Sequence, residues 1–383
     1  MSTTLKGNWN YPTTVWAGPG RLAELPAAAE RAGIRHPLIV TDKGLLAAPM
    51  IARAAGLVGA AVFGDVSGNP TAAHVEAGLA AYRAGGHDGV VAIGGGAALD
   101  TGKTIAFMSG QSRPLWDFED VGDWWTRAVP AGIAPVVAIP TTAGTGSEVG
   151  RAGVILNEET HQKKIIFHPL MMPKIVILDP ELTVGLPRAV TAATGMDAFV
   201  HCFEAFCAPG FHPLADGVAL EGMRLIATYL PRACANGADI EARAQMLAAA
   251  AMGATAFQKG LGGVHAIAHP VGSFYGTHHG LTNAVILPYV MVHNRAAIEA
   301  KCEIVARLLG LPQGGFDGLL AWVIGLRREL GIQHSLAQIG VDTAQATVIG
   351  REAAIDPSAG GNPIPVDATA LEKIFRAAVA GQL

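Results

Sequence analysis

The stretch Gly89–Lys103, GVVAIGGGAALDTGK, places a short apolar run directly before three consecutive glycines. The run Gly89–Ile93 is rich in valine and isoleucine, which predicts a buried strand, and the residues after Gly96 predict a helix. Glycines let a backbone approach a ligand closely, and the free N–H groups at the start of a helix favour a pyrophosphate. Taken alone, the three glycines are equally compatible with a tight turn. The rest of the chain must decide between a phosphate-binding loop and a simple connection.

Apolar runs of the same kind recur through the first half of the chain. Continuous runs separated by longer segments are typical of parallel strands that are covered by helices on both faces. The segment Thr71–Ala84 predicts one such helix, and the residues between Asn157 and Pro173 predict a detour of shorter antiparallel strands. The first half is therefore predicted to be a Rossmann-like α/β domain with a parallel sheet that binds a dinucleotide. The predicted strands are Pro37–Asp42, Val62–Val66, Gly89–Ile93, Val136–Pro140 and Ile175–Leu178.

The second half has a different pattern, with long alanine-rich periodic segments and almost no strand runs, which predicts an all-α domain. The 383 residues exceed the roughly 250–300 at which a single core stops growing, so two domains are expected. The boundary is predicted between Leu182 and Pro187, since a proline fits the first turn of a helix. The predicted domains are therefore residues 1–185 and 186–383. The predicted helices are Arg188–Phe206, Pro213–Leu230, Ile240–Phe257, Asn294–Leu309, Phe316–Leu330 and Thr369–Val379.

A second loop, PTTAGTGSE from Pro140 to Glu148, follows another predicted strand and supplies small hydroxyl side chains. Both loops lie at the carboxyl ends of parallel strands, where ligands bind in open α/β sheets, so the pair favours a phosphate-binding loop over a tight turn. The glycines do not fit the usual GxGxxG pattern. The acid Asp42 ends an earlier strand, where it can accept hydrogen bonds from ribose hydroxyls and repel a 2′-phosphate. This position favours NAD over NADP.

The composition argues against several classes of function. Only 15% of the residues are charged and the formal net charge is −4, so no strong positive field exists to hold nucleic acid or an anionic membrane. No apolar run approaches the roughly 18 residues needed to span a bilayer, and the first residues lack the pattern of a secretory signal. The four cysteines form no CxxC pair, as expected of reduced thiols. We therefore expect a cytoplasmic protein with no nucleic-acid or membrane partner.

Four histidines gather in an apolar, glycine-rich stretch of the second half, Gly260–Pro288. His265 and His269 stand four residues apart and would share one face of a helix. Pro270 is expected to end that helix, because the residue before a proline is biased away from helical geometry. For any one of these histidines a hydrogen-bonded core position is the commoner role. A metal site would need partners elsewhere in the chain.

A carboxylate and an imidazole on one predicted helical face supply such partners. Asp197 and His201 are also four residues apart, among apolar neighbours where an unpaired carboxylate would be costly to bury. Together with His265 and His279 they would provide one oxygen and three nitrogen ligands, a set that suits Fe²⁺ or Zn²⁺. A single carboxylate leaves such a site cationic, so it can act as a Lewis acid on an alcohol or carbonyl oxygen.

Five motifs, spread in order along nearly the whole chain, resemble those of the iron-containing (group III) alcohol dehydrogenase family. The resemblance implies the fold that this family shares with dehydroquinate synthase, and a metal-dependent, NAD-linked hydride transfer between a primary alcohol and nicotinamide. It also implies a homodimer or a larger homo-oligomer. The motifs are GGGAALDTGK, PTTAGTGSEV, TAATGMDAFVH, GLGGVHAIAHPVGSFYGTHHGLTNAVILP and DPSAGGNPIP.

The resemblance also implies roles for individual residues. His269 falls on a histidine that is not a ligand but lines the cleft beside the metal, and we expect it, or a ribose hydroxyl of the cofactor, to receive the proton first. The metal ligands of the family fall on Asp197, His201, His265 and His279. The cofactor contacts fall on Asp42, Gly94, Gly95, Gly96, Asp100, Thr141, Thr142 and Thr145, with Lys164 and Leu182 in the same cleft.

Two segments depart from the family pattern and leave the substrate open. After Glu148, where the family often has a threonine, an arginine and an aromatic residue, the chain has Val149–Gly153, VGRAG. Between Phe257 and Gly260 the spacing is about one residue shorter than in lactaldehyde reductase-like members. Both segments lie close to the expected substrate pocket of the family. Two other functions also stay open. One is a lyase of the dehydroquinate synthase type, whose metal set usually contains a glutamate and two histidines, and the other is a scaffold kept as a sensor without catalysis.

Overall fold

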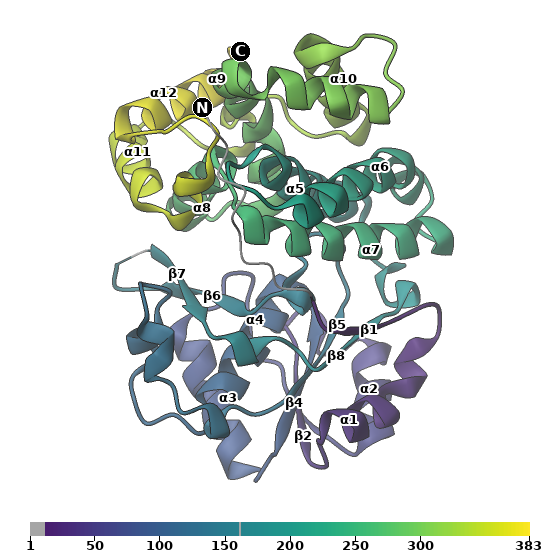
Figure 1. Ribbon diagram of the computed structural model, residues 1–383. Helices are drawn as coiled ribbons and strands as arrows, with labels where there is room; N and C mark the ends of the chain where they lie inside the picture. The colour runs from purple at the N-terminus through teal and green to yellow at the C-terminus, as the bar shows by residue number, and fades with distance from the viewer. Residues whose placement is uncertain (1–11, 161) are drawn as a thin grey trace. The chain divides into compact units, whose positions relative to one another are not determined.

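A six-stranded parallel sheet forms the centre of the first unit in the computed structural model, which describes residues 12–160 and 162–383 (Figure 1). These residues divide into one unit of residues 12–185 and another of residues 186–383. The strand order is β1-β8-β5-β4-β2-β3, and every neighbouring pair is parallel. The strands are β1 (Thr14–Ala17), β2 (Pro37–Val40), β3 (Ala61–Phe63), β4 (Gly89–Gly94), β5 (Val136–Pro140) and β8 (Ile175–Leu178).

Both faces of this sheet are buried, which explains its continuous apolar runs. Along β4, Val90 and Ala92 belong to the core on one face, whereas Val91 and Ile93 belong to the core on the other. Helices α3 and α4 cover the first face and helices α1 and α2 cover the second, as Figure 1 shows. The helices are α1 (Leu25–Ala32), α2 (Pro49–Val58), α3 (Ala72–Ala84) and α4 (Gly96–Met108).

The connections after β2 and β4 leave the sheet toward opposite faces, although these strands are neighbours. The chain passes from β2 to α2 on one face and from β4 to α4 on the other. A crevice at the carboxyl ends of two such strands is the place where open α/β sheets bind ligands. The topology therefore singles out the residues that follow β2 and β4.

The sequence predicted this unit well. The five predicted strands are present with small shifts at their ends, and the expected antiparallel detour is the hairpin of β6 (Ala152–Asn157) and β7 (Gln162–Phe167). The edge strand β1, which pairs with β8, was missed because it is only four residues long and alternates between half-buried and exposed positions. Helices α1 and α2 were missed as well.

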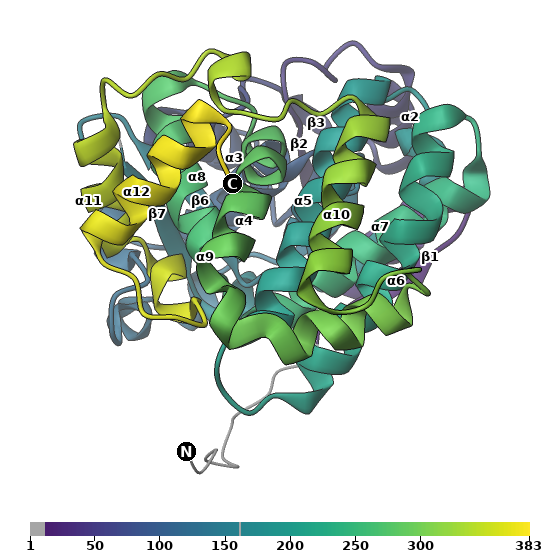
Figure 2. The same ribbon diagram turned by 90° about the horizontal axis from the view of Figure 1, so that it is seen from above.

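The second unit is helical, as predicted. In this unit α9 packs against α5, α8, α10 and α12, whereas α6 and α7 pack against each other and against α5 (Figure 2). No helix in the part of the chain that the structure describes is long and apolar enough to cross a membrane. The helices are α5 (Arg188–Cys207), α6 (Pro213–Ala235), α7 (Ile240–Ala256), α8 (Gly263–Tyr275), α9 (His279–Leu308), α10 (Gly315–Leu330), α11 (Ala346–Ile355) and α12 (Ala368–Ala380).

Two expectations about this unit were wrong. Pro270 does not end its helix, because α8 continues through it to Tyr275. A proline inside a helix costs about 3 kcal/mol, and the complete burial of Val271 just after it offsets part of that cost. Helix α9 also begins at His279, well before the predicted start at Asn294, and runs through an internal Pro288. Burial therefore outweighs local helix propensity on both sides of the histidine cluster.

Candidate active site

The loop after β4 lies against the end of β2. Gly94 has a φ of 151°, which side chains other than hydrogen rarely allow. A Cβ at this position would lie 2.6 Å from Ala98 Cβ and 3.1 Å from Asp42 Oδ2. The glycine thus allows α4 to begin directly beside Asp42. Burial raises the pKa of Asp42, and a hydrogen bond from the Leu45 backbone opposes that rise.

The predicted threonines of the loop after β5 meet the same glycines. Thr141 donates its backbone N–H to the Gly94 carbonyl over 2.9 Å. Thr142 Oγ1 lies 3.5 Å from the position that a Cβ on Gly95 would take, and Thr145 Oγ1 lies 2.7 Å from the equivalent position on Gly96. Two hydroxyls therefore lie beside the glycines at the start of α4, where free N–H groups and hydroxyls together suit phosphate oxygens.

Asp100 lies behind this loop and is fully engaged with the chain itself. One carboxylate oxygen accepts from Ser147 Oγ at 2.5 Å and the other accepts from the Val154 N–H at 3.1 Å. The Lys103 ammonium lies 3.3 Å from the first of these oxygens. These bonds favour a role for Asp100 in holding the two loops together. A direct cofactor contact from Asp100 stays a prediction.

Lys103 is the most buried cation of this unit, with a relative exposure of 1%. Its ammonium donates to the carbonyl oxygens of Ser147 at 2.9 Å, of Gly150 at 3.5 Å and of Ala152. Burial lowers its pKa, and the charge of Asp100 opposes that shift. Lys103 therefore ties α4 to the loop after β5 and to the start of β6.

Lys164 and Leu182 have other contacts in the structure. The Lys164 ammonium forms an ion pair with Glu119 at 2.7 Å and lies 5.9 Å from the ring centroid of Trp116. Leu182 is buried in the core on the face covered by α1 and α2. Neither contact involves the glycine loop, so the roles of both residues in cofactor binding stay predictions.

In the helical unit, three of the four predicted ligands point at one another. Among the described residues, one ligand atom each from Asp197, His265 and His279 lies within 4.8 Å of the other two. Asp197 Oδ1 is 3.9 Å from His265 Nε2 and 3.8 Å from His279 Nε2. Ligand atoms around a tetrahedral Zn²⁺ with bonds of about 2.0–2.2 Å lie about 3.5 Å apart. The observed spacing therefore fits a divalent ion after a small contraction.

Asn283 marks the point where these lone pairs converge. Its Nδ2 lies 2.7 Å from Asp197 Oδ1, 3.1 Å from His265 Nε2 and 3.2 Å from His279 Nε2. An amide nitrogen carries two hydrogens and cannot serve three acceptors. Asn283 is completely buried, and its Oδ1 has no hydrogen-bond partner. The cluster therefore presents more acceptors to this one nitrogen than the nitrogen can serve, as expected of a site for a cation.

A glycine brings the first turn of α9 close enough to complete this group. A Cβ at Gly280 would lie 2.7 Å from the Ala193 carbonyl oxygen and 3.0 Å from Asp197 Cβ. Only hydrogen fits there without a shift of one helix. Gly280 therefore allows α9 to approach α5 so that His279 reaches Asp197.

His201, the fourth predicted ligand, lies beside the group of three. Its ring stacks on that of His265, with centroids 4.6 Å apart and an interplanar angle of 20°. The residue is buried, with 3% exposure. Its place on α5 one turn after Asp197 agrees with the sequence spacing, and its role as a ligand stays a prediction.

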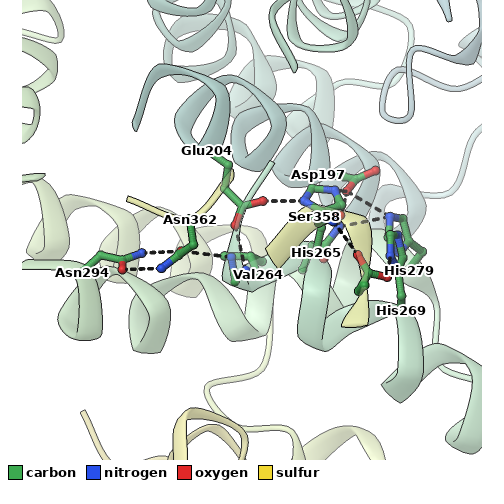
Figure 3. A network of polar contacts seen from close by, with 12 residues as sticks. Asp197, Glu204, Val264, His265, His269, His279, Asn294, Ser358 and Asn362 are labelled. Carbon is green, nitrogen blue, oxygen red and sulfur yellow. Dashed lines mark hydrogen bonds and ion pairs between the residues drawn. The ribbon is translucent and has the colours of Figure 1, made fainter. Parts of the chain in front are cut away.

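His265 and His269 each bind a carboxylate through Nδ1. His265 Nδ1 lies 2.6 Å from Glu204 Oε2, and His269 Nδ1 lies 2.8 Å from Asp356 Oδ2. Figure 3 shows Glu204, His265 and Asp197 in one line of polar contacts. Burial tends to lower the pKa of His265, but the hydrogen bond and charge of Glu204 outweigh it and raise that pKa. The neighbouring His278 instead accepts from the Leu281 N–H as the N-cap of α9.

The sequence analysis missed three residues of this site, although each had a signal. Glu204 follows Asp197 by seven residues and therefore lies on the same face of α5. Asn283 follows His279 by four residues on α9. Asp356 opens the motif DPSAGGNPIP, which had been used only as a family marker. A polar residue at helical spacing from a predicted ligand, inside an apolar run, was the signal that could have found the first two.

The comparisons with known proteins agree with this geometry. Residues 12–180 match the family model described as iron-containing alcohol dehydrogenase. Residues 191–379 match the model described as Fe-containing alcohol dehydrogenase family, C-terminal. The two matches cover nearly all of the described chain.

Individual relatives also align with most of the chain. The 4-hydroxybutyrate dehydrogenase of Cupriavidus necator is 41% identical over 344 residues, which are 86% of this chain and 89% of the relative. A crystal structure of 1,3-propanediol oxidoreductase has a TM-score of 0.92 at 32% identity and covers 97% of this chain and 100% of its own. The sulfoacetaldehyde reductase of Bifidobacterium kashiwanohense, solved in complex with NAD⁺, has a TM-score of 0.87 at 29% identity, with coverages of 97% and 99%. The predicted fold and the predicted family resemblance are confirmed.

Proposed function

The chain belongs to the iron-containing alcohol dehydrogenase family, and from this premise we propose that it oxidises a primary alcohol to its aldehyde, and catalyses the reverse reduction, with NAD and a divalent metal ion. The observation that carries the proposal is the convergence of lone pairs from Asp197, His265 and His279 on one buried point. Fe²⁺ is the proposed ion and Zn²⁺ the alternative, since this donor set suits both.

The residues of the helical unit would hold the ion. Asp197 supplies a charged oxygen, and His265 and His279 supply neutral nitrogens, with His201 as the proposed fourth ligand. When bound, the ion provides a Lewis acid for the alcohol oxygen and NAD provides the acceptor of the hydride. Asn283 donates to Asp197 Oδ1 and so fixes the direction in which this carboxylate faces.

His269 is proposed to take the proton that the alcohol releases, either directly or after a cofactor hydroxyl. Asp356 accepts from its Nδ1 at 2.8 Å, so the lone pair is left on Nε2. Its ring is nearly parallel to that of His279, with centroids 5.4 Å apart. A base beside the ligand group and held by its own carboxylate suits this role.

The loops of the α/β unit would hold NAD. The start of α4 and the hydroxyls of Thr142 and Thr145 suit its pyrophosphate, and Asp42 suits the ribose hydroxyls. The negative charge of Asp42 disfavours a 2′-phosphate, so NAD is proposed over NADP. A homodimer or larger homo-oligomer and a cytoplasmic location stay predictions.

Metal analysis coupled to a turnover assay tests the proposal. The protein is purified without oxygen, its metal is quantified, and NADH formation is followed with short primary alcohols, 1,3-propanediol and 4-hydroxybutyrate. We expect about one divalent ion per chain and steady NADH formation, faster with NAD than with NADP. We expect His265→Ala to lose bound metal and turnover together, because a neutral nitrogen ligand is removed.

A histidine outside the group serves as the matched control. His334→Ala should retain both metal and turnover, since its ring lies against the Gly381 carbonyl and the ring of Tyr289, which are not residues of the proposed site. Full turnover by metal-free protein would overturn the proposal. Binding of NAD without steady NADH formation on any alcohol would favour the sensor or the lyase.

A further inference from the structure

Glu204 is a buried carboxylate on α5 that is not one of the predicted metal ligands. It is 5% exposed, and no Lys or Arg in residues 12–160 or 162–383 forms an ion pair with it. Its Oε1 accepts from the Val264 N–H at 2.7 Å, and its Oε2 lies 2.6 Å from His265 Nδ1. A buried charge without a basic partner is costly unless its hydrogen bonds are complete. These two contacts must therefore stabilise it.

The start of α8 is built around this carboxylate. Val264 lies in the first turn of α8, where free N–H groups and the helix dipole favour a negative charge. The Gly263 N–H beside it donates to Asn362 Oδ1 at 3.1 Å. Asn362 and Asn294 hold each other by two hydrogen bonds of 2.8 Å, so the anchor of this helix end extends to α9 (Figure 3). Glu204 has little freedom to turn away from His265.

The consequence for His265 follows from hydrogen-bond chemistry. An ionised carboxylate can only accept, so the proton of the neutral imidazole is held on Nδ1. The lone pair is then on Nε2, which faces Asp197 Oδ1 at 3.9 Å. Metal-binding histidines usually hold such an outer carboxylate, and losing it typically costs 10–100-fold in metal affinity.

We propose that Glu204 is a positioning residue that sets the metal affinity of the site by fixing the tautomer of His265. This proposal rests on the metal site of the proposed function. The neighbouring pair of His269 and Asp356 has the same chemistry at 2.8 Å, but His269 is outside the group of converging ligand atoms. The two carboxylates therefore have separate roles, and only Glu204 controls the ion.

Glu204→Gln tests this role with almost no change of shape. The amide has one acceptor oxygen for two N–H donors, so it cannot satisfy Val264 and His265 together. If the amide oxygen keeps accepting from the Val264 N–H, the amide N–H₂ group faces His265 Nδ1. The neutral imidazole must then carry its proton on Nε2, so Nε2 has no lone pair for a metal ion. We expect Co²⁺ and Zn²⁺ affinities, measured by chelator competition, to fall 10–100-fold, with a changed visible spectrum of the Co²⁺ protein. Glu204→Asp keeps an acceptor-only carboxylate and should recover most of the affinity.

Asp356→Asn is the matched control, since it makes the same change in the neighbouring pair and should alter metal affinity less than about threefold. Unchanged metal affinity in Glu204→Gln would overturn the proposal while leaving the proposed function intact, and so would equal losses in both variants. A wild-type protein that binds neither ion would refute the metal site and the proposal together. If Glu204→Gln does not fold, ¹⁵N NMR of the wild-type histidines decides. A proton on Nδ1 of His265 is expected, and one on Nε2 would overturn the proposal.

Discussion

The two units bury charge in opposite ways. In the α/β unit, the Lys103 ammonium brings its own positive charge to Asp100 and to three backbone carbonyls, so the cluster is complete without a ligand. In the helical unit, Asp197 and two imidazoles converge on a point where the neutral amide nitrogen of Asn283 lies within hydrogen-bond distance of all three. One cluster holds a cation that belongs to the chain, and the other is arranged to take a cation from outside.

This difference separates a structural use of buried charge from a functional one. A buried charge that is satisfied within the chain contributes to the fold without any ligand. Removing one partner destabilises the fold strongly, because the other charge is left buried and unpaired. A cluster with unsatisfied acceptors gains stability only when its ligand binds. The two units should therefore respond differently to mutation, to metal and to pH.

The largest expected effect comes from removing the cation of the α/β unit. Lys103→Met keeps the length of the side chain but leaves Asp100 without its charge partner and the carbonyls of Ser147 and Ala152 without their donor. We expect a loss of about 3–5 kcal/mol in the free energy of unfolding, as for other broken buried pairs. Urea titration followed by tryptophan fluorescence measures it, since Trp16, Trp116, Trp124 and Trp125 lie in this unit.

A lysine on the surface of the same unit gives the comparison. Lys43 forms a 2.7 Å ion pair with Asp65, and both side chains are more than 60% exposed. Lys43→Met should therefore cost less than about 1 kcal/mol. A loss below about 1 kcal/mol for Lys103→Met as well would show that the buried ammonium is dispensable and would remove the contrast between the two clusters.

The next effect concerns the helical unit and follows from metal binding. Adding Zn²⁺ or Fe²⁺ to metal-free protein at 100 to 1,000 times the Kd should stabilise the folded state by about 2.7–4.1 kcal/mol. Hydrogen–deuterium exchange should show the protection in peptides of α5, α8 and α9, and not in β4 and α4. The site residues lie on the first three helices alone.

The same exchange experiment on His265→Ala provides the control. Its peptides should gain no protection, since one of the converging nitrogens is absent. Equal protection of β4 and α4 in the wild type would indicate that the ion binds elsewhere or that the units unfold together. Either result would break the proposed separation between them.

The sequence predicted some parts of the fold and of the site better than others, and the difference has a physical reason. Period and composition were enough for the strands, since β2, β4, β5 and β8 are buried on both faces and read as continuous apolar runs. Helical spacing and the family motifs singled out Asp197, His265 and His279, whose side chains lie close together in the structure, and their role as ligands stays a prediction. These features are local, or are carried by motifs whose order is fixed.

The missed features depend on contacts between distant segments. Glu204 and His265 are 61 residues apart, and His269 and Asp356 are 87 apart. No spacing rule links such pairs. The prediction that Pro270 ends its helix was wrong because it considered only the local bias of proline against helical geometry. In the folded unit, the burial of α8 outweighs that bias.

The smallest of the three effects is a pH dependence that the α/β unit should show. Burial raises the pKa of Glu148 from 4.5 to about 7, and the charge of Lys103 only partly opposes it. Between these two pH values the folded state holds a proton on Glu148 that the unfolded state has lost. The contribution of Glu148 to stability is therefore greatest below about pH 4.5, falls as the pH rises to about 7, and is constant above that. A rise of about 2.5 pKa units corresponds to about 3 kcal/mol in full, of which a part is already lost below pH 4.5 and a part is lost only above pH 7.

Glu148→Gln isolates this contribution because an amide of the same shape does not titrate. Relative to this variant, the wild type should lose on the order of 2 kcal/mol of unfolding free energy between pH 4.5 and 7, measured by urea titration at a series of pH values. Other groups titrate in both proteins, so their effects cancel in the difference. A difference that stays constant with pH would mean that Glu148 is ionised throughout, paired with Lys103. The α/β cluster would then be a complete ion network, and its contrast with the acceptor-rich site of the helical unit would be sharper still.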